Sequence, residues 1–170
     1  MRRRRVLLLS TAAVVLVALV ALSGCGMLIR KGTEAATGVK VDQNGGKVTI
    51  QGKDGGTATV QEGKLPDGLP SDFPVYAGTI RLGNKITNAD GTAFQIVIET
   101  PDDAKTVGDW YAEKLKAAGW KVEGRNDVVT NGKAITTIVA KSGTTKQAMI
   151  ITGQSADNNT NSVNISLSVK

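Results

Sequence analysis

Tight-turn residues recur along positions 39–170, between short segments in which apolar and polar residues alternate. Asn and Asp tolerate a positive φ angle, as Gly does, so pairs such as Asn131-Gly132 favour tight turns between antiparallel strands. The alternation predicts strands at Val39–Val41, Lys47–Gln51, Thr57–Gln61, Thr79–Ile86, Ala93–Thr100, Lys121–Val129, Lys133–Ala140, Gln147–Thr152 and Val163–Val169. Links this short force neighbouring strands to run antiparallel.

One segment has the periodicity of a helix instead. Between Thr100 and Gly119, apolar residues recur three or four positions apart, so one face is apolar. We expect Thr100 to cap the N-terminus, Pro101 to take the first helical position and Asp103 to complete a capping box. Gly119 is expected to end the helix in the left-handed conformation. The order of elements predicts an α+β fold, in which a single helix packs across a curved antiparallel sheet.

The composition divides the chain into four parts. Residues 1–24 read as an export signal, residues 25–38 as a tether and residues 39–64 as a small β-meander, followed by the α+β domain over residues 65–170. The meander has few large apolar side chains, so it is marginal alone. We expect it to dock on the main domain, to dock on a partner, or to be partly mobile.

The predicted export signal has three zones. Arg2–Arg5 is positively charged, Val6–Leu22 is almost entirely apolar, and a short segment with small residues follows. At about 1.5 Å per residue, a helix over the apolar zone reaches roughly 26 Å, the short end of what spans a bilayer. Length alone therefore leaves an uncleaved membrane anchor open as an alternative.

The tetrapeptide Leu22-Ser23-Gly24-Cys25 resembles the lipobox of bacterial lipoproteins. Small residues before the cysteine let a membrane signal peptidase reach the backbone, and the apolar Leu22 suits a lipid-facing pocket. The resemblance implies that Cys25 becomes the first residue of the mature protein, with a thioether-linked diacylglycerol and an N-acyl chain such as palmitate. Two acyl chains already give a stable anchor. The implied location is the extracytoplasmic face of the cell membrane, or the outer membrane if the source has two membranes.

Residues 65–170 resemble a recurrent domain of small secreted bacterial lipoproteins of uncharacterised function. The shared pattern is a proline-rich entry, two strands, and a helix that ends in Ala118-Gly119-Trp120 before a β-meander. The arrangement is also similar to the helix-grip domains of some envelope-assembly lipoproteins. These resemblances imply a fold and no particular activity.

Composition excludes several kinds of chemistry. The chain has no His and a single Cys, so it contains no Ser-His-Asp triad, Cys-His dyad, His-ligated zinc site or intrachain disulfide. The formal net charge is +6, but Arg2–Arg5 supply much of it, and residues 66–170 carry equal numbers of basic and acidic groups. We therefore expect no nucleic-acid partner, because binding phosphates requires a basic surface.

Two polar patterns have structural interpretations. Asp102 and Asp103 are adjacent carboxylates, but they lie in the predicted first helical turn, where capping explains them. Residues Asp157, Asn159 and Asn161 match the first ligand positions of a calcium loop, whereas the glycine and the bidentate glutamate of that loop are missing. We expect no metal and no cofactor beyond the lipid on Cys25.

The sequence thus predicts a lipid-anchored, non-catalytic lipoprotein whose domain binds a protein or cell-envelope partner, for instance by strand addition at an open sheet edge. The alternative is a carrier or sensor of a small apolar ligand held between helix and sheet. Val107, Tyr111 and Leu115 would line that groove. An enzyme that uses only carboxylates, Lys or Ser/Thr would need such groups to converge, and their spacing does not suggest this.

Overall fold

The computed structural model describes residues 40–44, 46–154 and 160–170. The chain divides into two compact units, residues 1–41 and residues 42–170, and the second contains nearly all of the described residues. No helix in these ranges is long and apolar enough to cross a membrane. The predicted export signal, including Leu22, Ser23, Gly24 and Cys25, lies outside the described residues.

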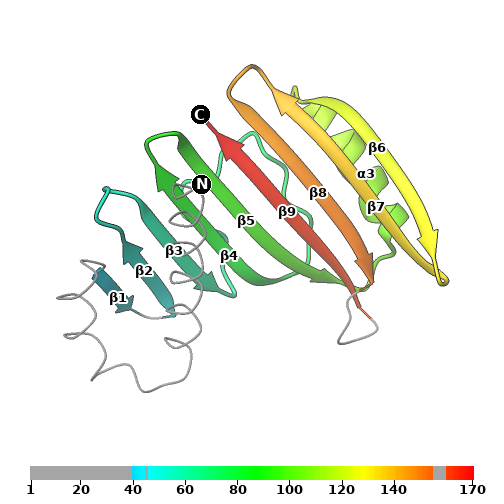
Figure 1. The fold of residues 1–170 in the computed structure, drawn as a ribbon. Coiled ribbons are helices and arrows are strands. Elements are labelled where there is room, and N and C mark those ends of the chain that lie inside the picture. The colour runs from blue at the N-terminus through cyan, green and yellow to red at the C-terminus, as the bar shows by residue number, and fades with distance from the viewer. Residues whose placement is uncertain (1–39, 45, 155–159) are drawn as a thin grey trace, which may run out of the picture. The chain divides into compact units, whose positions relative to one another are not determined.

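The strands form one open sheet in the order β1-β2-β3-β4-β5-β9-β8-β7-β6, and every pairing from β2 to β6 along it is antiparallel (Figure 1). Their bounds are β1 (Lys40–Asn44), β2 (Lys47–Gln51), β3 (Thr57–Glu62), β4 (Thr79–Asn88), β5 (Gly91–Thr100), β6 (Lys121–Thr130), β7 (Lys133–Ser142), β8 (Lys146–Gln154) and β9 (Asn161–Val169). With the helix α3 (Ala104–Ala117) packed on this sheet, the predicted α+β fold is confirmed.

The turn signals identify real hairpins. Asn131 and Gly132, between β6 and β7, have φ angles of 52° and 74°, as a tight turn with two left-handed residues requires. The predicted meander continues the same sheet, because β3 pairs with β4 from Thr57 opposite Thr87 to Glu62 opposite Leu82.

The predicted start of the helix is wrong. Thr100 is the last residue of β5, where it is paired with Asn161 of β9 and is 2% exposed, so it cannot serve as a helix cap. The N-cap is Asp103, whose Oδ1 accepts a hydrogen bond from the backbone N–H of Thr106 at 2.7 Å. The helix therefore begins after Pro101, which lies in the bend between strand and helix.

The predicted end of the helix is confirmed. Gly119 has a φ angle of 81°, and its N–H donates to the carbonyl of Lys116 at 3.0 Å. The N–H of Trp120 donates to the carbonyl of Leu115 at 2.8 Å. These two bonds form the Schellman arrangement that closes many helices at a glycine.

The core lies on one side of the sheet, which we call the inner face. Its strand residues are Phe94, Ile96, Ile98, Ile138, Ala140, Ala148, Ile150, Val163, Ile165 and Leu167. Helix α3 covers the part formed by β6, β7 and β8. The connector between β3 and β4 contributes Phe73, whose ring lies edge-on to Trp120 at 5.4 Å between centroids. The indole N–H of Trp120 donates to the carbonyl of Asp72, which ties the connector to the end of the helix.

Candidate functional site

The predicted groove residues all lie on the side of α3 that faces the sheet. Val107, Tyr111 and Leu115 are 0% exposed and belong to the same core as the inner strand residues. Full burial of three large side chains on a short helix accounts for much of its attachment, since each contributes about 1.5–3 kcal/mol. The structure therefore brings these residues together as a packed layer between α3 and the sheet.

Gly108 marks the closest approach of helix and sheet. A Cβ atom at this position would lie 2.6 Å from Cγ2 of Thr136, which is on β7. The helix backbone thus rests directly on that strand. A ligand at this point would have to displace the helix, so any small-molecule site between the two layers lies to one side of Gly108.

Three aromatic side chains gather where the connector meets α3. The ring of Trp110 lies edge-on to Tyr76 at 5.0 Å and to Tyr111 at 4.9 Å between centroids. The backbone N–H of Tyr76 donates to the hydroxyl of Tyr111 at 3.2 Å, and burial raises the pKa of that hydroxyl. The Tyr76 hydroxyl donates to Asp102 at 2.6 Å, which raises the pKa of Tyr76 to about 12. Both hydroxyls stay protonated at neutral pH, so they act here as hydrogen-bonding groups.

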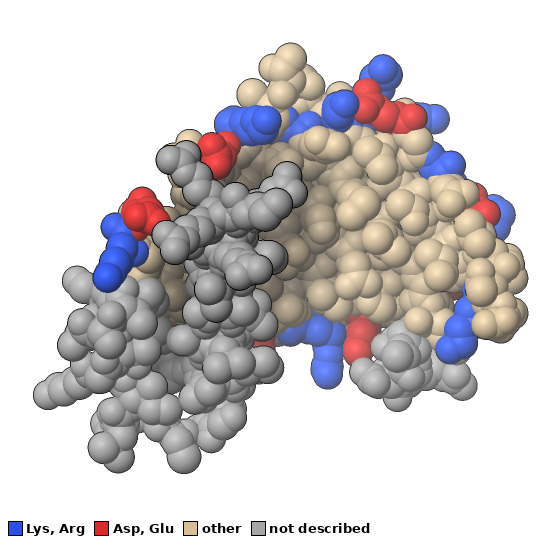
Figure 2. Space-filling view, in the orientation of Figure 1, with Lys and Arg blue, Asp and Glu red and all other residues tan. Residues whose placement is uncertain are grey.

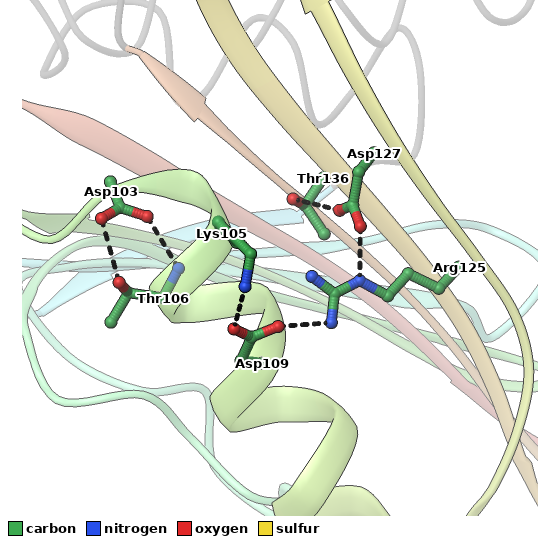
Figure 3. Close-up of polar contacts among 7 residues, drawn as sticks. All are labelled: Asp103, Lys105, Thr106, Asp109, Arg125, Asp127 and Thr136. Atoms are coloured by element: carbon green, nitrogen blue, oxygen red, sulfur yellow. Dashed lines mark hydrogen bonds and ion pairs between the residues drawn. The ribbon is translucent and has the colours of Figure 1, made fainter.

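A charged cluster joins α3 to the edge strand β6 (Figure 3). Asp109 on the helix accepts hydrogen bonds from Lys105 and from Arg125, each at 2.7 Å. The Arg125 guanidinium also donates to Asp127 at 2.9 Å, and Asp127 accepts from the hydroxyl of Thr136 at 2.6 Å. Two cations and two carboxylates alternate in this series of contacts, so their charges balance. The cluster therefore links the edge strand to the helix.

A β-bulge explains why Arg125 and Asp127 point toward the helix. The register of β6 against β7 shifts between Val122 and Gly124, so alternation restarts one residue later. After the shift, Arg125 lies opposite the buried Ile138, on the inner face. The sequence does not predict this cluster, because strict alternation from Val122 places both charged residues on the other face of the sheet.

The pKa values of the cluster move away from neutrality. Hydrogen bonds from Lys105 and Arg125 lower the pKa of Asp109, and the bond from Thr136 lowers that of Asp127. Asp109 in turn raises the pKa of Lys105 and of Arg125. None of these groups exchanges a proton near neutral pH, which favours a structural role over acid–base chemistry. Among the described residues, no set of three or more His, Cys, Asp or Glu side chains could hold a metal ion.

One buried hydroxyl beneath α3 is left without a partner. Thr152 lies next to Thr136 across β8 and β7, it is 1% exposed, and its Oγ1 forms no hydrogen bond within the described part of the chain. An unsatisfied buried hydroxyl costs about 1–3 kcal/mol. This position would therefore accept a polar atom of a small ligand or a water molecule.

The two acidic residues singled out in the sequence have separate roles. Asp103 caps the helix, and the bonds from Thr106 lower its pKa. Asp102 accepts hydrogen bonds from Tyr76 and from Thr100. Of the calcium-like pattern, Asp157 and Asn159 lie outside the described residues, and Asn161 begins β9.

The side of the sheet opposite α3 has an uncharged centre. Two neighbouring cross-strand rows run from β6 to β5 on this outer face, and no charged residue interrupts them. One row consists of Asn126, Thr137, Ile151, Asn164 and Val97, and the other of Gly124, Val139, Met149, Ser166 and Gln95. In Figure 1 α3 lies behind the strands, so Figure 2 shows this outer face, where Lys, Arg, Asp and Glu gather around the margin. We call these two rows the uncharged face.

Comparison with known proteins identifies one family. Residues 82–168, from β4 through α3 to β9, match the model of the START domain-like family. A search of curated proteins found no match.

Proposed function

This chain belongs to the START domain-like family, and from that premise we propose that it is a non-catalytic binding protein, exported as a lipoprotein and anchored outside a bacterial membrane. The family match over the helix and six strands supports the binding part of the proposal alone, since it suggests an α+β domain that binds a ligand. Val6–Leu22 and the only cysteine of the chain, Cys25, support the anchor.

The balance of charge supports binding over catalysis. The chain has no His, and the charged cluster of α3 and β6 pairs each cation with a carboxylate. Exposed polar and aliphatic side chains instead cover the sheet surface opposite the helix. A protein or cell-envelope partner that docks there requires no movement of the packed core, so this surface is the one we assign to partner binding.

A second candidate function is the binding of a small apolar ligand between α3 and the sheet. The family match and the unpartnered hydroxyl of Thr152 favour it, because a ligand with one polar end would satisfy that hydroxyl. The contact of Gly108 with β7 restricts the space, so the helix or the connector would have to shift. Mass spectrometry of organic extracts from the purified full chain tests this function, and extracts without a stoichiometric ligand would exclude it.

Replacing the cysteine tests the proposed anchor. We expect Cys25→Ser to prevent acylation, because a serine hydroxyl cannot form the thioether. The unprocessed precursor should accumulate, and mass spectrometry of its N-terminus should find residue 1 intact. Ser23→Ala is the matched control, since it keeps a small residue beside the cleavage point and should leave processing unchanged. A mature wild-type chain with a free thiol on Cys25 would contradict the proposal.

A further inference from the structure

We propose that the free edge of β6 binds an extended, uncharged segment of another protein, which adds to the sheet as a further strand. The inference rests on the proposed binding function, because β6 forms one margin of the sheet surface that we assign to partner binding. β6 is the last strand in the order, so one of its edges has no neighbouring strand (Figure 1). The stretch Asn126–Thr130 is exposed throughout, so the described part of the chain leaves this edge open.

The main-chain groups of this edge fit a polypeptide strand. β6 and β7 are joined by the two-residue turn of Asn131 and Gly132, and the residues that flank such a turn exchange hydrogen bonds with each other. Hydrogen-bonded pairs alternate along an antiparallel ladder, so Arg125, Asp127 and Val129 direct their N–H and C=O groups away from β7. These groups recur about every 7 Å along β6, which matches the donors and acceptors of an incoming strand.

The charged side chains of this stretch are already paired within the chain. The Arg125 guanidinium donates to Asp109 of α3, and Asp127 accepts from Thr136 of β7. Charged side chains that project across an edge oppose strand addition, whereas these two are held over the inner face. The outer-face residues of the stretch are uncharged: Asn126, Val128 and Thr130. An uncharged segment therefore fits this edge.

Two consecutive valines at the edge are exposed on opposite faces of the sheet. Val128 and Val129 are 43% and 72% exposed. A partner that docks on one face of the sheet would cover only one of them. A strand added to the edge places neighbours beside both, and β-branched or aromatic pairs across strands stabilise a sheet. We therefore expect the incoming segment to have apolar residues at two consecutive positions.

A second copy of this chain fits the edge poorly. A two-fold pairing of identical strands is antiparallel, so it would align Gly124–Thr130 with itself in reverse. In each such register that pairs more than three residues, Val129 faces a charged residue of the second copy: Arg125, Asp127 or Glu123. A valine opposite a charged side chain gains no apolar contact. A segment of a different protein has no such restriction.

Amide hydrogen exchange on the full chain tests the contact with a defined probe. The probe is an uncharged seven-residue peptide of threonine and valine, with two consecutive valines at its centre. At millimolar concentration, we expect it to slow exchange at the Arg125, Asp127 and Val129 amides of the isotope-labelled, detergent-solubilised chain by at least about tenfold. The amides of Asn126 and Val128 already face β7 and should not change.

Two results of this experiment would overturn the proposal. One is unchanged exchange at the three outward amides in the presence of the probe. The other is slow exchange at these amides without the probe that depends on the concentration of the chain, because a second copy would then occupy the edge. Slowing of other amides alone would place the probe elsewhere, which overturns strand addition at β6 and leaves the proposed binding function intact.

Replacing Val129 provides an independent test. Val129→Pro removes an outward N–H and no bond to β7, and proline is tolerated at such edge positions. We expect this variant to bind a fluorescent form of the probe at least about tenfold more weakly, with a native circular dichroism spectrum. Val129→Lys keeps the main chain and places a charge at the edge, so it should weaken binding in the same way.

The matched control is Val129→Thr. It keeps both the N–H group and a β-branched side chain, so it should bind the probe within about threefold of the wild-type chain. If Val129→Lys is folded and binds the probe as tightly as Val129→Thr does, the proposal is overturned, whether or not Val129→Pro folds.

Discussion

At the scale of single residues, the two tyrosines show how different surroundings shift a pKa in the same direction. The Tyr76 hydroxyl donates a hydrogen bond to the Asp102 carboxylate, which favours the protonated form of Tyr76, whereas Tyr111 is surrounded by core side chains that cannot solvate a charge. In both cases the folded state favours the protonated form. The two hydroxyls therefore make their full contribution to the stability of the folded state below pH 10, the ordinary pKa of tyrosine. This contribution is lost as the pH rises through their higher pKa values in the folded state.

These shifts predict a late tyrosine titration. The chain has two tyrosines, so the ultraviolet absorbance of tyrosinate reports on these residues alone. We expect little tyrosinate in the folded chain until the pH approaches about 12, the pKa of Tyr76, and ordinary titration near pH 10 in denaturant. Tyr76→Phe leaves Tyr111 as the single reporter, and its titration should still be late. If circular dichroism shows a folded chain and its tyrosines nevertheless titrate near pH 10, the assigned contacts would be contradicted.

At the scale of elements, local signals predicted which segments form strands and turns, but long-range pairing decided where the helix begins. Thr100 and Pro101 have the sequence of a helix start, yet Thr100 pairs with Asn161 far along the chain and stays in the sheet. Asp103 takes over the cap, because its carboxylate reaches the N–H of Thr106. The end at Gly119 depends only on neighbouring residues, which is why the sequence predicted it correctly.

The charged cluster could not be predicted for a similar reason. A bulge after Val122 turns Arg125 and Asp127 toward α3, and nothing in the local alternation marks its position. Gly108 is a signal in the sequence, because glycine is disfavoured in the interior of a helix such as α3. Its purpose follows only once β7 is seen to lie against the helix backbone.

The close contact at Gly108 predicts that a larger residue at this position destabilises the packing of the helix on the sheet. Alanine is favoured over glycine in a helix by about 1 kcal/mol, but the added methyl group would overlap Thr136, and overpacking costs about 1–3 kcal/mol. We expect Gly108→Ala to lower the free energy of unfolding in urea. Thr136→Ser removes the overlapping methyl group and keeps the hydroxyl that binds Asp127, so the loss should shrink in the double variant. Equal losses in the two backgrounds would show that helix and sheet are not in contact there.

At the scale of the whole molecule, the strand order creates surfaces that no single segment encodes. The strands β5 and β9 are far apart in sequence, but they pair from Thr92 opposite Val169 to Thr100 opposite Asn161. Their neutral outward residues then fall in line with those of β8 and β7, and the uncharged face results. The sequence predicted strands with exposed polar positions, but their alignment into rows required the topology.

The distribution of titratable groups predicts a stability that does not vary with pH around neutrality. The chain has no His, and the pKa values of Asp103, Asp109, Asp127 and Glu123 are lowered by hydrogen bonds from neighbouring groups. An acidic group with a lowered folded pKa stabilises the protein above its ordinary value, 3.8 for Asp, and this contribution is lost as the pH falls through the folded value. We therefore expect the Tm to be constant from about pH 5 to about pH 9. At lower pH the Tm should decrease, as these carboxylates become protonated.

The variant Asp127→Asn tests this assignment. It should lower the Tm between about pH 5 and about pH 9 and make the decrease of the Tm in acid shallower, because it removes one of the groups that release protons on folding. A change in the Tm between pH 6 and pH 8 would mean that a group outside these contacts titrates with folding, which would contradict the assignment.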